Sequence, residues 1–141
     1  LAKIMFFLDN KEDTEKNNLI KVAALLIYTA KIDENYSNQE EQIIRESMIQ
    51  LGSKKEEIEE LIIEAKKIEE NSNQILEFTK EVKNLSNDKK IKIVETLWKI
   101  IYSNKDADIY ETNLMRRLSG LLYIDSKVMG DIKERIKGEN S

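Results

Sequence analysis

The chain has 141 residues, of which 27 are acidic and 23 basic, and its net charge is −4. This length is typical of one domain, and the acidic balance argues against a general nucleic-acid-binding protein, because such proteins usually carry a basic excess. Cysteine and histidine are both absent, which excludes disulfides, thiolate chemistry, the usual zinc sites and histidine-based catalysis. Oxygen atoms are the donors that remain for a metal ion.

The composition predicts an all-α fold. The chain contains no proline and only four glycines, and it is rich in Lys, Glu, Ile and Leu, which favour helices joined by short polar turns. The longest uninterrupted apolar run covers residues 22–28, far fewer than the roughly 20 residues that a membrane-spanning helix needs. We therefore expect no segment that crosses a bilayer.

The N-terminal region divides into two parts. Residues 1–8 predict a short helix that packs onto the domain, with exposure to a partner or a membrane surface as the alternative. Its apolar core of about five residues is shorter than the roughly 7–15 residues of a secretory signal, so we expect a cytoplasmic protein, with the inner face of the membrane as a second option. The polar run 9–18 is interpreted as a linker grading into a helix. The predicted division is thus an N-terminal segment and linker, 1–18, and a helical domain, 19–137.

Two segments, 19–32 and 89–102, are apolar on nearly all sides, which is typical of helices buried at the centre of a bundle. An acidic loop and then a second helix follow each of them. Ser37 and Glu40 open the first of these second helices at the spacing of a capping box, in which each side chain bonds the other residue's backbone N–H. The spacing recurs where Asp108 and Glu111 open its counterpart.

The remaining helices are predicted from caps and apolar spacing. Gly52 suits the left-handed position after a helix, and Ser53, with Glu56 three residues later, predicts that the next helix begins at once. A shorter helix is expected around 75–82. Asp125 is positioned to cap the last helix.

The two halves repeat with an offset of 71 residues, the difference between positions 108 and 37. The offset aligns apolar positions as well as caps. The aligned pairs are Ile20 with Ile91, Val22 with Ile93, Leu26 with Leu97, Ile43 with Leu114, Ile44 with Met115, Leu51 with Leu122, and Leu61 with Ile132. We therefore predict a single bundle of about six or seven helices with an internal pseudo-twofold repeat.

The segment LWKIIYSNKDADIYETNLMRRLSGLL (97–122) and, more loosely, LLIYTAKIDENYSNQEEQII (25–44) resemble the tellurite-resistance TerB-like domains of bacteria. The resemblance spans roughly 19–136, and its most specific part runs from the Tyr-Glu to the Arg-Arg pair. It implies a small all-helical domain built from two related halves, connected with stress response or with envelope processes.

The resemblance also implies a metal site formed by the two loops. The acidic positions that the family is suggested to use fall on Asp33, Glu40, Asn104 and Glu111. Charge and symmetry, rather than the resemblance, add Glu41, Asp106 and Asp108 as candidates for extra ligands, and Asp106 is not part of the family's pattern. Oxygen donors favour Ca²⁺, Mg²⁺ or Mn²⁺. Glu34 and Lys105 replace the family's glycines and Asn104 is neutral, which predicts weak affinity or a lost site. Helix capping explains the two glutamates without any ligand, and both roles are compatible because a carboxylate has two oxygens.

Other polar and aromatic residues favour structural roles. Arg116 and Arg117 point about 100° apart on a helix, so at most one faces the acidic loop. Trp98 and Tyr102 are expected in the core and at its edge. A non-enzymatic binding module is the favoured function. An enzyme would need two converging carboxylates in a cleft, and a structural adaptor would act through residues 1–8. We expect protein partners, with peripheral membrane association left open, and no nucleic acid.

Overall fold

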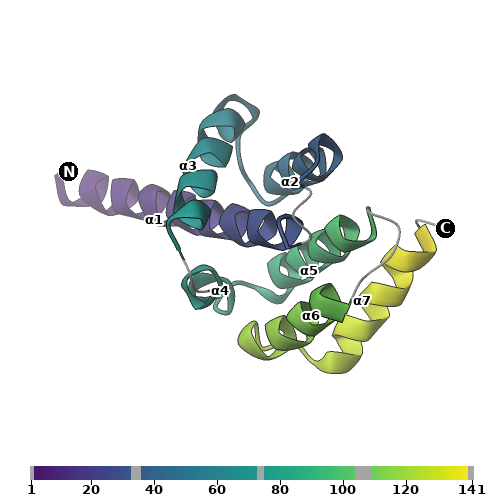
Figure 1. Cartoon of the computed structure of the whole chain (residues 1–141). Coiled ribbons are helices and arrows are strands. Elements are labelled where there is room, and N and C mark those ends of the chain that lie inside the picture. The colour runs from purple at the N-terminus through teal and green to yellow at the C-terminus, as the bar shows by residue number, and fades with distance from the viewer. Residues whose placement is uncertain (1, 33–35, 73–74, 104–108, 140–141) are drawn as a thin grey trace.

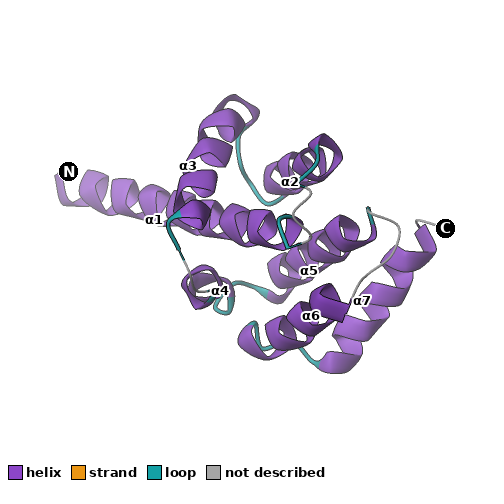
Figure 2. Cartoon of the chain, in the orientation of Figure 1, coloured by secondary structure: helices purple, strands orange, loops and turns teal. Residues whose placement is uncertain are grey.

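The structure, a computed structural model, describes the backbone of residues 2–32, 36–72, 75–103 and 109–139, and within these ranges the side chains from residue 15 onward, those of 109–111 excepted. The described residues form helices joined by short loops and contain no strand (Figure 2). The predicted all-α bundle of six or seven helices is confirmed. No helix in this part of the chain is long and apolar enough to span a membrane.

Within the described ranges, seven α-helices and one short 3₁₀ helix follow one another along the chain (Figure 1). They are α1 (Ala2–Ala30), α2 (Asn38–Gln50), η1 (Lys55–Glu57), α3 (Ile58–Glu70), α4 (Leu76–Val82), α5 (Asn87–Tyr102), α6 (Ile109–Leu121) and α7 (Ser126–Glu139).

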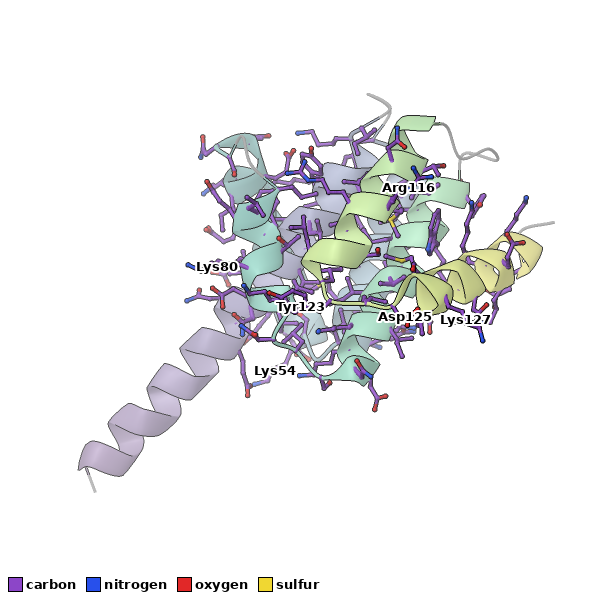
Figure 3. The ribbon with its side chains drawn as sticks, turned by 90° about the horizontal axis from the view of Figure 1, so that it is seen from below. Lys54, Lys80, Arg116, Tyr123, Asp125 and Lys127 are labelled. Carbon is purple, nitrogen blue, oxygen red and sulfur yellow. The ribbon has the colours of Figure 1, made fainter. Side chains whose placement is uncertain are left out.

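The first helix differs from expectation. Residues 2–30 form one continuous helix, so the polar run 9–18, interpreted as a linker, is helical, and the predicted division at residue 18 falls inside α1. The run lacks proline and glycine, and its lysines and glutamates are good helix formers, so nothing in it stops a helix that continues from the core. The N-terminal half of α1 extends beyond the other helices (Figures 1 and 3), so the expected packing of residues 1–8 onto the domain is wrong for the described part, 2–8.

The core lies where the two apolar segments cross. α1 and α5 pack against each other, and α1 also packs against α2, α3 and α4. Leu25 and Leu26 of α1 and Leu97 and Ile101 of α5 are fully buried. Both segments were predicted as central helices, and the prediction is confirmed. An apolar helix of this kind must be covered on several sides, since each exposed aliphatic side chain would forgo about 1.5–3 kcal/mol of burial.

The internal repeat is visible in the bounds of the helices. α2 begins at residue 38 and ends at 50, and α6 begins at 109 and ends at 121, so both ends differ by 71 residues. The same offset relates the start of η1, residue 55, to the start of α7, residue 126. In each half the first helix packs against the third, α1 on α3 and α5 on α7. The pseudo-twofold bundle is therefore confirmed.

The predicted caps of the later helices have different outcomes. Asp125 Oδ1 accepts a hydrogen bond from the Lys127 N–H at 2.7 Å and so caps α7. Ser53 does not begin a helix. It is buried, its hydroxyl bonds the Lys54 carbonyl, and the chain enters α3 through a 3₁₀ turn without a side-chain cap. Ser86, which the sequence analysis did not single out, caps α5.

Candidate functional site

Most of the predicted metal ligands lie outside the described residues. Asp33 and Asn104 fall in the two loops that are not described, as do the further ligands Asp106 and Asp108. Glu111 lies in the first turn of α6, but its side chain is also outside the described set. Glu40 and the neighbouring Glu41 are the predicted ligands whose side chains the structure describes.

Glu40 is held in the capping box that the sequence predicted. Its backbone N–H donates to Ser37 Oγ at 3.1 Å, and its Oε1 accepts from the Ser37 backbone N–H at 3.2 Å and from the Ser37 hydroxyl at 3.0 Å. The residue is only 1% exposed. A buried carboxylate is costly unless it is hydrogen-bonded, and these bonds supply that compensation for one oxygen while fixing the start of α2.

Glu41 belongs to a polar cluster between α2 and α3. Lys66 Nζ lies 2.7 Å from Glu41 Oε1, and the Tyr36 hydroxyl donates to the same oxygen at 3.4 Å. Lys66 Nζ also lies 5.6 Å from the centroid of the Tyr36 ring, within the range of a cation–π interaction. The hydrogen bond from Lys66 lowers the pKa of Glu41, whereas burial, followed by the nearby charge of Glu41, raises the pKa of Tyr36. The ammonium of Lys66 occupies the position where a cation would approach Glu41.

Beside this cluster, Arg45 on α2 pairs with Glu59 on α3 through both carboxylate oxygens, one of them 3.1 Å from Arg45 Nη2. Such a bidentate pair is a favourable geometry for an arginine and a carboxylate. The charges on this side of the bundle therefore neutralise one another. Among the residues that the structure describes, no group of three or more acidic side chains converges to hold a metal ion.

A model of the family described as tellurite resistance protein TerB matches residues 19–134. The chain belongs to this family. The resemblance drawn from the residues around the Tyr-Glu and Arg-Arg pairs is thereby confirmed. No curated protein and no solved structure matches the chain.

The aromatic residues in the family's Leu-Trp segment have the structural roles that were predicted. Trp98 and Tyr102 are both buried on α5, and their rings stack with centroids 5.8 Å apart. Lys133 of α7 places its Nζ 5.5 Å from the centroid of the Trp98 ring. The indole N–H of Trp98 is buried and has no hydrogen-bond partner among the residues that the structure describes. These residues join α5 to α7 in the second half of the TerB domain.

The family's Arg-Arg pair points outward. Arg116 and Arg117 are both exposed on α6, in agreement with the expected solvated arginines. Arg117 borders a hollow of about 470 Å³ between α1 and α6, which is also lined by Tyr28, Ile32 and Leu114. Ile32 is the last described residue before the first loop, so this arginine places positive charge beside the end of α1.

Sequence reasoning missed one cluster, at the end of α6, where Tyr123 lies between Lys83 and Lys90. No motif marks it. The offset of 71 residues pairs Tyr123 with Gly52, a position already predicted to be left-handed, and this pairing was the signal in the sequence that would have revealed it.

Proposed function

We propose that this TerB-family chain is a non-enzymatic binding module that takes a divalent cation at its two acidic loops, through Asp33, Glu40, Asn104 and Glu111. The observation that carries the proposal is the repeat. The offset that relates α2 to α6 also relates Glu40 to Glu111, so the two halves offer equivalent carboxylates at equivalent helix starts. Oxygen donors of this kind favour Ca²⁺, Mg²⁺ or Mn²⁺.

The geometry of Glu40 limits how it would take part. Its Oε1 accepts two hydrogen bonds from Ser37, so capping and coordination would share one carboxylate. Such sharing is chemically feasible because an ionised carboxylate has about four lone-pair positions on two oxygens. It also predicts weak binding, since the capping bonds compete with the cation for electron density.

A thermal melt with and without millimolar Ca²⁺, Mg²⁺ or Mn²⁺ tests the proposal. Binding to the folded state alone raises its stability by RT ln(1 + [L]/Kd), about 2.7 kcal/mol when the cation is at a hundredfold excess over Kd. We expect at least one of the cations to raise the midpoint, and Asp33→Ala to abolish that rise. Asp131→Ala, which removes an exposed acid of α7, is the matched control and should keep it. A midpoint that no cation moves, or a rise that survives Asp33→Ala, refutes the proposal.

A second candidate, a protein-interaction adaptor without metal, is favoured by a different observation. The N-terminal half of α1 extends away from the rest of the bundle (Figures 1 and 3), and its sequence contains the apolar run 4–8. A projecting segment of this composition is suited to contact a partner. Deleting residues 1–8 should abolish an interaction of the chain without changing its melting midpoint, and an unchanged set of interactions would remove this candidate.

A further inference from the structure

The end of α6 has an unusual backbone. The Ile124 N–H donates to the Ser119 carbonyl at 2.9 Å, and the Tyr123 N–H donates to the Gly120 carbonyl at 3.3 Å, which is the Schellman pattern of a helix end. This pattern places Tyr123 at φ 55, and it is the only non-glycine residue with positive φ in the described part of the chain. A bulky aromatic residue is rarely found there, because its Cβ crowds the backbone. Folding alone would favour glycine at this position.

The side chain of Tyr123 has two lysine ammonium groups close to its ring, and the residue remains 71% exposed. Lys83, at the end of α4, has its Nζ 5.8 Å from the centroid of the Tyr123 ring, and Lys90, in α5, has its Nζ 5.9 Å from it. Lys90 is only 8% exposed. Cations over an aromatic ring are attracted to it, but two ammonium groups at one ring repel each other. An anion placed beside the ring would relieve this repulsion.

The ring also borders a groove. A hollow of about 310 Å³ lies between α4 and the end of α6, and Leu76, Lys80, Lys83, Leu121 and Tyr123 are among its lining residues. Leu76 is an exposed large apolar side chain. In the view of Figure 3, Tyr123 lies on the surface facing the reader, with Lys80 of α4 to its left, whereas Lys127 of α7 lies on the opposite side and is not among the residues that line the groove. The groove thus combines apolar walls with a basic rim.

The acidic side chains of α4 contact other groups than the lysines of that rim. Glu81 pairs with Lys21 of α1 at 3.2 Å. Glu77 keeps its negative charge but accepts a hydrogen bond from the Ser72 hydroxyl at 2.8 Å, and neither glutamate lines the groove. Within the described ranges, no carboxylate lies within ion-pair distance of Lys80, Lys83 or Lys90. A protein with a net charge of −4 therefore presents here a local positive groove, which would attract a negatively charged partner.

We propose that this groove binds an acidic peptide segment of a partner protein, which inserts a large apolar side chain between Leu76 and Tyr123 and sets its carboxylates against Lys80 and Lys83. The chemistry of the surface supports this occupant: apolar walls select an apolar side chain, and the unpaired ammonium groups select carboxylates. A concave surface receives a protruding side chain better than it receives a flat bilayer. The small groove predicts weak, transient binding.

The test uses the full chain and fluorescence anisotropy of a labelled amphipathic peptide of about 16 residues, a length of roughly 24 Å as a helix, with Glu and Leu at helical spacing. A counterpart with Lys in place of Glu is the control peptide. We expect the acidic peptide to bind, its affinity to fall as salt is raised, and the basic peptide not to bind. K83E and K80E should each weaken binding about tenfold, as expected for loss of a charge pair at an interface. K127E, the same charge change on α7, should leave it unchanged.

Tyr123→Gly separates binding from folding. It removes the ring and relaxes the backbone, so it should weaken peptide binding by about tenfold or more, as truncating an aromatic anchor does, while the melting midpoint stays close to that of the wild type. No binding of the acidic peptide at millimolar concentration, or equal losses in K83E and K127E, overturns the proposal. Binding of the chain to anionic phosphatidylglycerol vesicles but not to the peptide overturns it in favour of a lipid surface. Self-association lost in K83E, without peptide binding, overturns it in favour of a second copy.

Discussion

The ends of α2 and α6 are equivalent in the repeat and have the same hydrogen bonds, yet they carry different residues. At the end of α2, the Ser53 N–H donates to the Met48 carbonyl at 2.9 Å and the Gly52 N–H donates to the Ile49 carbonyl at 3.1 Å. Gly52 has φ 120, a conformation that only glycine adopts readily. At the end of α6, Tyr123 occupies the equivalent place.

The surroundings of the two positions differ as well. Leu19, the counterpart of Lys90, lines a hollow of about 240 Å³ beside Gly52, whereas at the other end the lysine stands over the tyrosine ring. The fold thus determines the backbone path at both helix ends but not the residue. Glycine is what stability selects there, and a strained aromatic residue on the surface is better explained by a role in binding.

The largest expected change in stability comes from truncating equivalent core residues of the two halves. Leu26→Ala and Leu97→Ala truncate fully buried, equivalent side chains of α1 and α5, and each should lower the free energy of unfolding by about 2–5 kcal/mol, the usual cost of such a cavity. Urea unfolding followed by circular dichroism measures both. A loss below about 1 kcal/mol for one of them would mean that the halves are not equivalent in packing.

Exchanging the residues at the two helix ends should change the stability of the protein unequally. Gly52→Tyr places a side chain at φ 120, so it should lower stability by about 1–3 kcal/mol even though no atom blocks a Cβ there. Tyr123→Gly relaxes the backbone but loses the contacts with two lysines, so its stability should stay within about 1 kcal/mol of the wild type. Thermal melts of both variants measure these changes. A large loss of stability in Tyr123→Gly would show that the tyrosine is kept for the fold.

The helix starts offer a third comparison. Ser37→Ala removes the hydroxyl that accepts from the Glu40 N–H and should cost about 1 kcal/mol, typical of a lost N-cap. If the predicted box of Asp108 and Glu111 repeats this arrangement, Asp108→Ala should cost a similar amount in urea unfolding. A neutral result for Asp108→Ala, with a loss for Ser37→Ala, would limit capping to the first half.

The smallest expected effect is a change of stability with pH that comes from the pair of Glu41 and Lys66. Lys66 lowers the pKa of Glu41 from its ordinary value of 4.5, so their pairing adds stability above that pH, and the contribution is lost as the pH falls below about 4.5 toward the folded-state pKa. Lys66→Met should therefore cost about 0.5 kcal/mol at pH 7 and less at pH 3, since partly exposed pairs contribute little. Urea midpoints at the two pH values measure this. Lys67→Met, which breaks the more exposed pair with Glu64, is the control and should show a smaller change.

Much of the fold follows from local patterns in the sequence. The apolar segments 19–32 and 89–102 could be identified as central because apolar residues occupy nearly all sides of both helices. Ser37 and Glu40 identified a helix start because their spacing satisfies two backbone N–H groups at once. The run 9–18 was misinterpreted because a solvated helix and a linker have similar compositions. The structure shows that the run is part of α1, which continues out of the core as one helix.

The candidate site was less predictable. Asp33 and Asn104 lie outside the described residues, and Glu40 can both cap a helix and bind a cation, so composition alone cannot separate the two roles. Tyr123 was missed because no propensity places tyrosine in a left-handed conformation. Its left-handed backbone goes with the hydrogen bonds that end α6, whereas the lysines around its ring come from α4 and α5, far away in the sequence.

Trp98 provides a fluorescent probe of one half of the molecule. It is the chain's only tryptophan, and it is buried against Tyr102 and Lys133 where α5 meets α7. Its emission therefore reports on the second half alone, while far-ultraviolet circular dichroism reports on helices of both halves. If the two signals change at the same urea concentration, the halves unfold as one cooperative unit. If the emission changes first, the second half opens independently, and the molecule behaves as two coupled folding units.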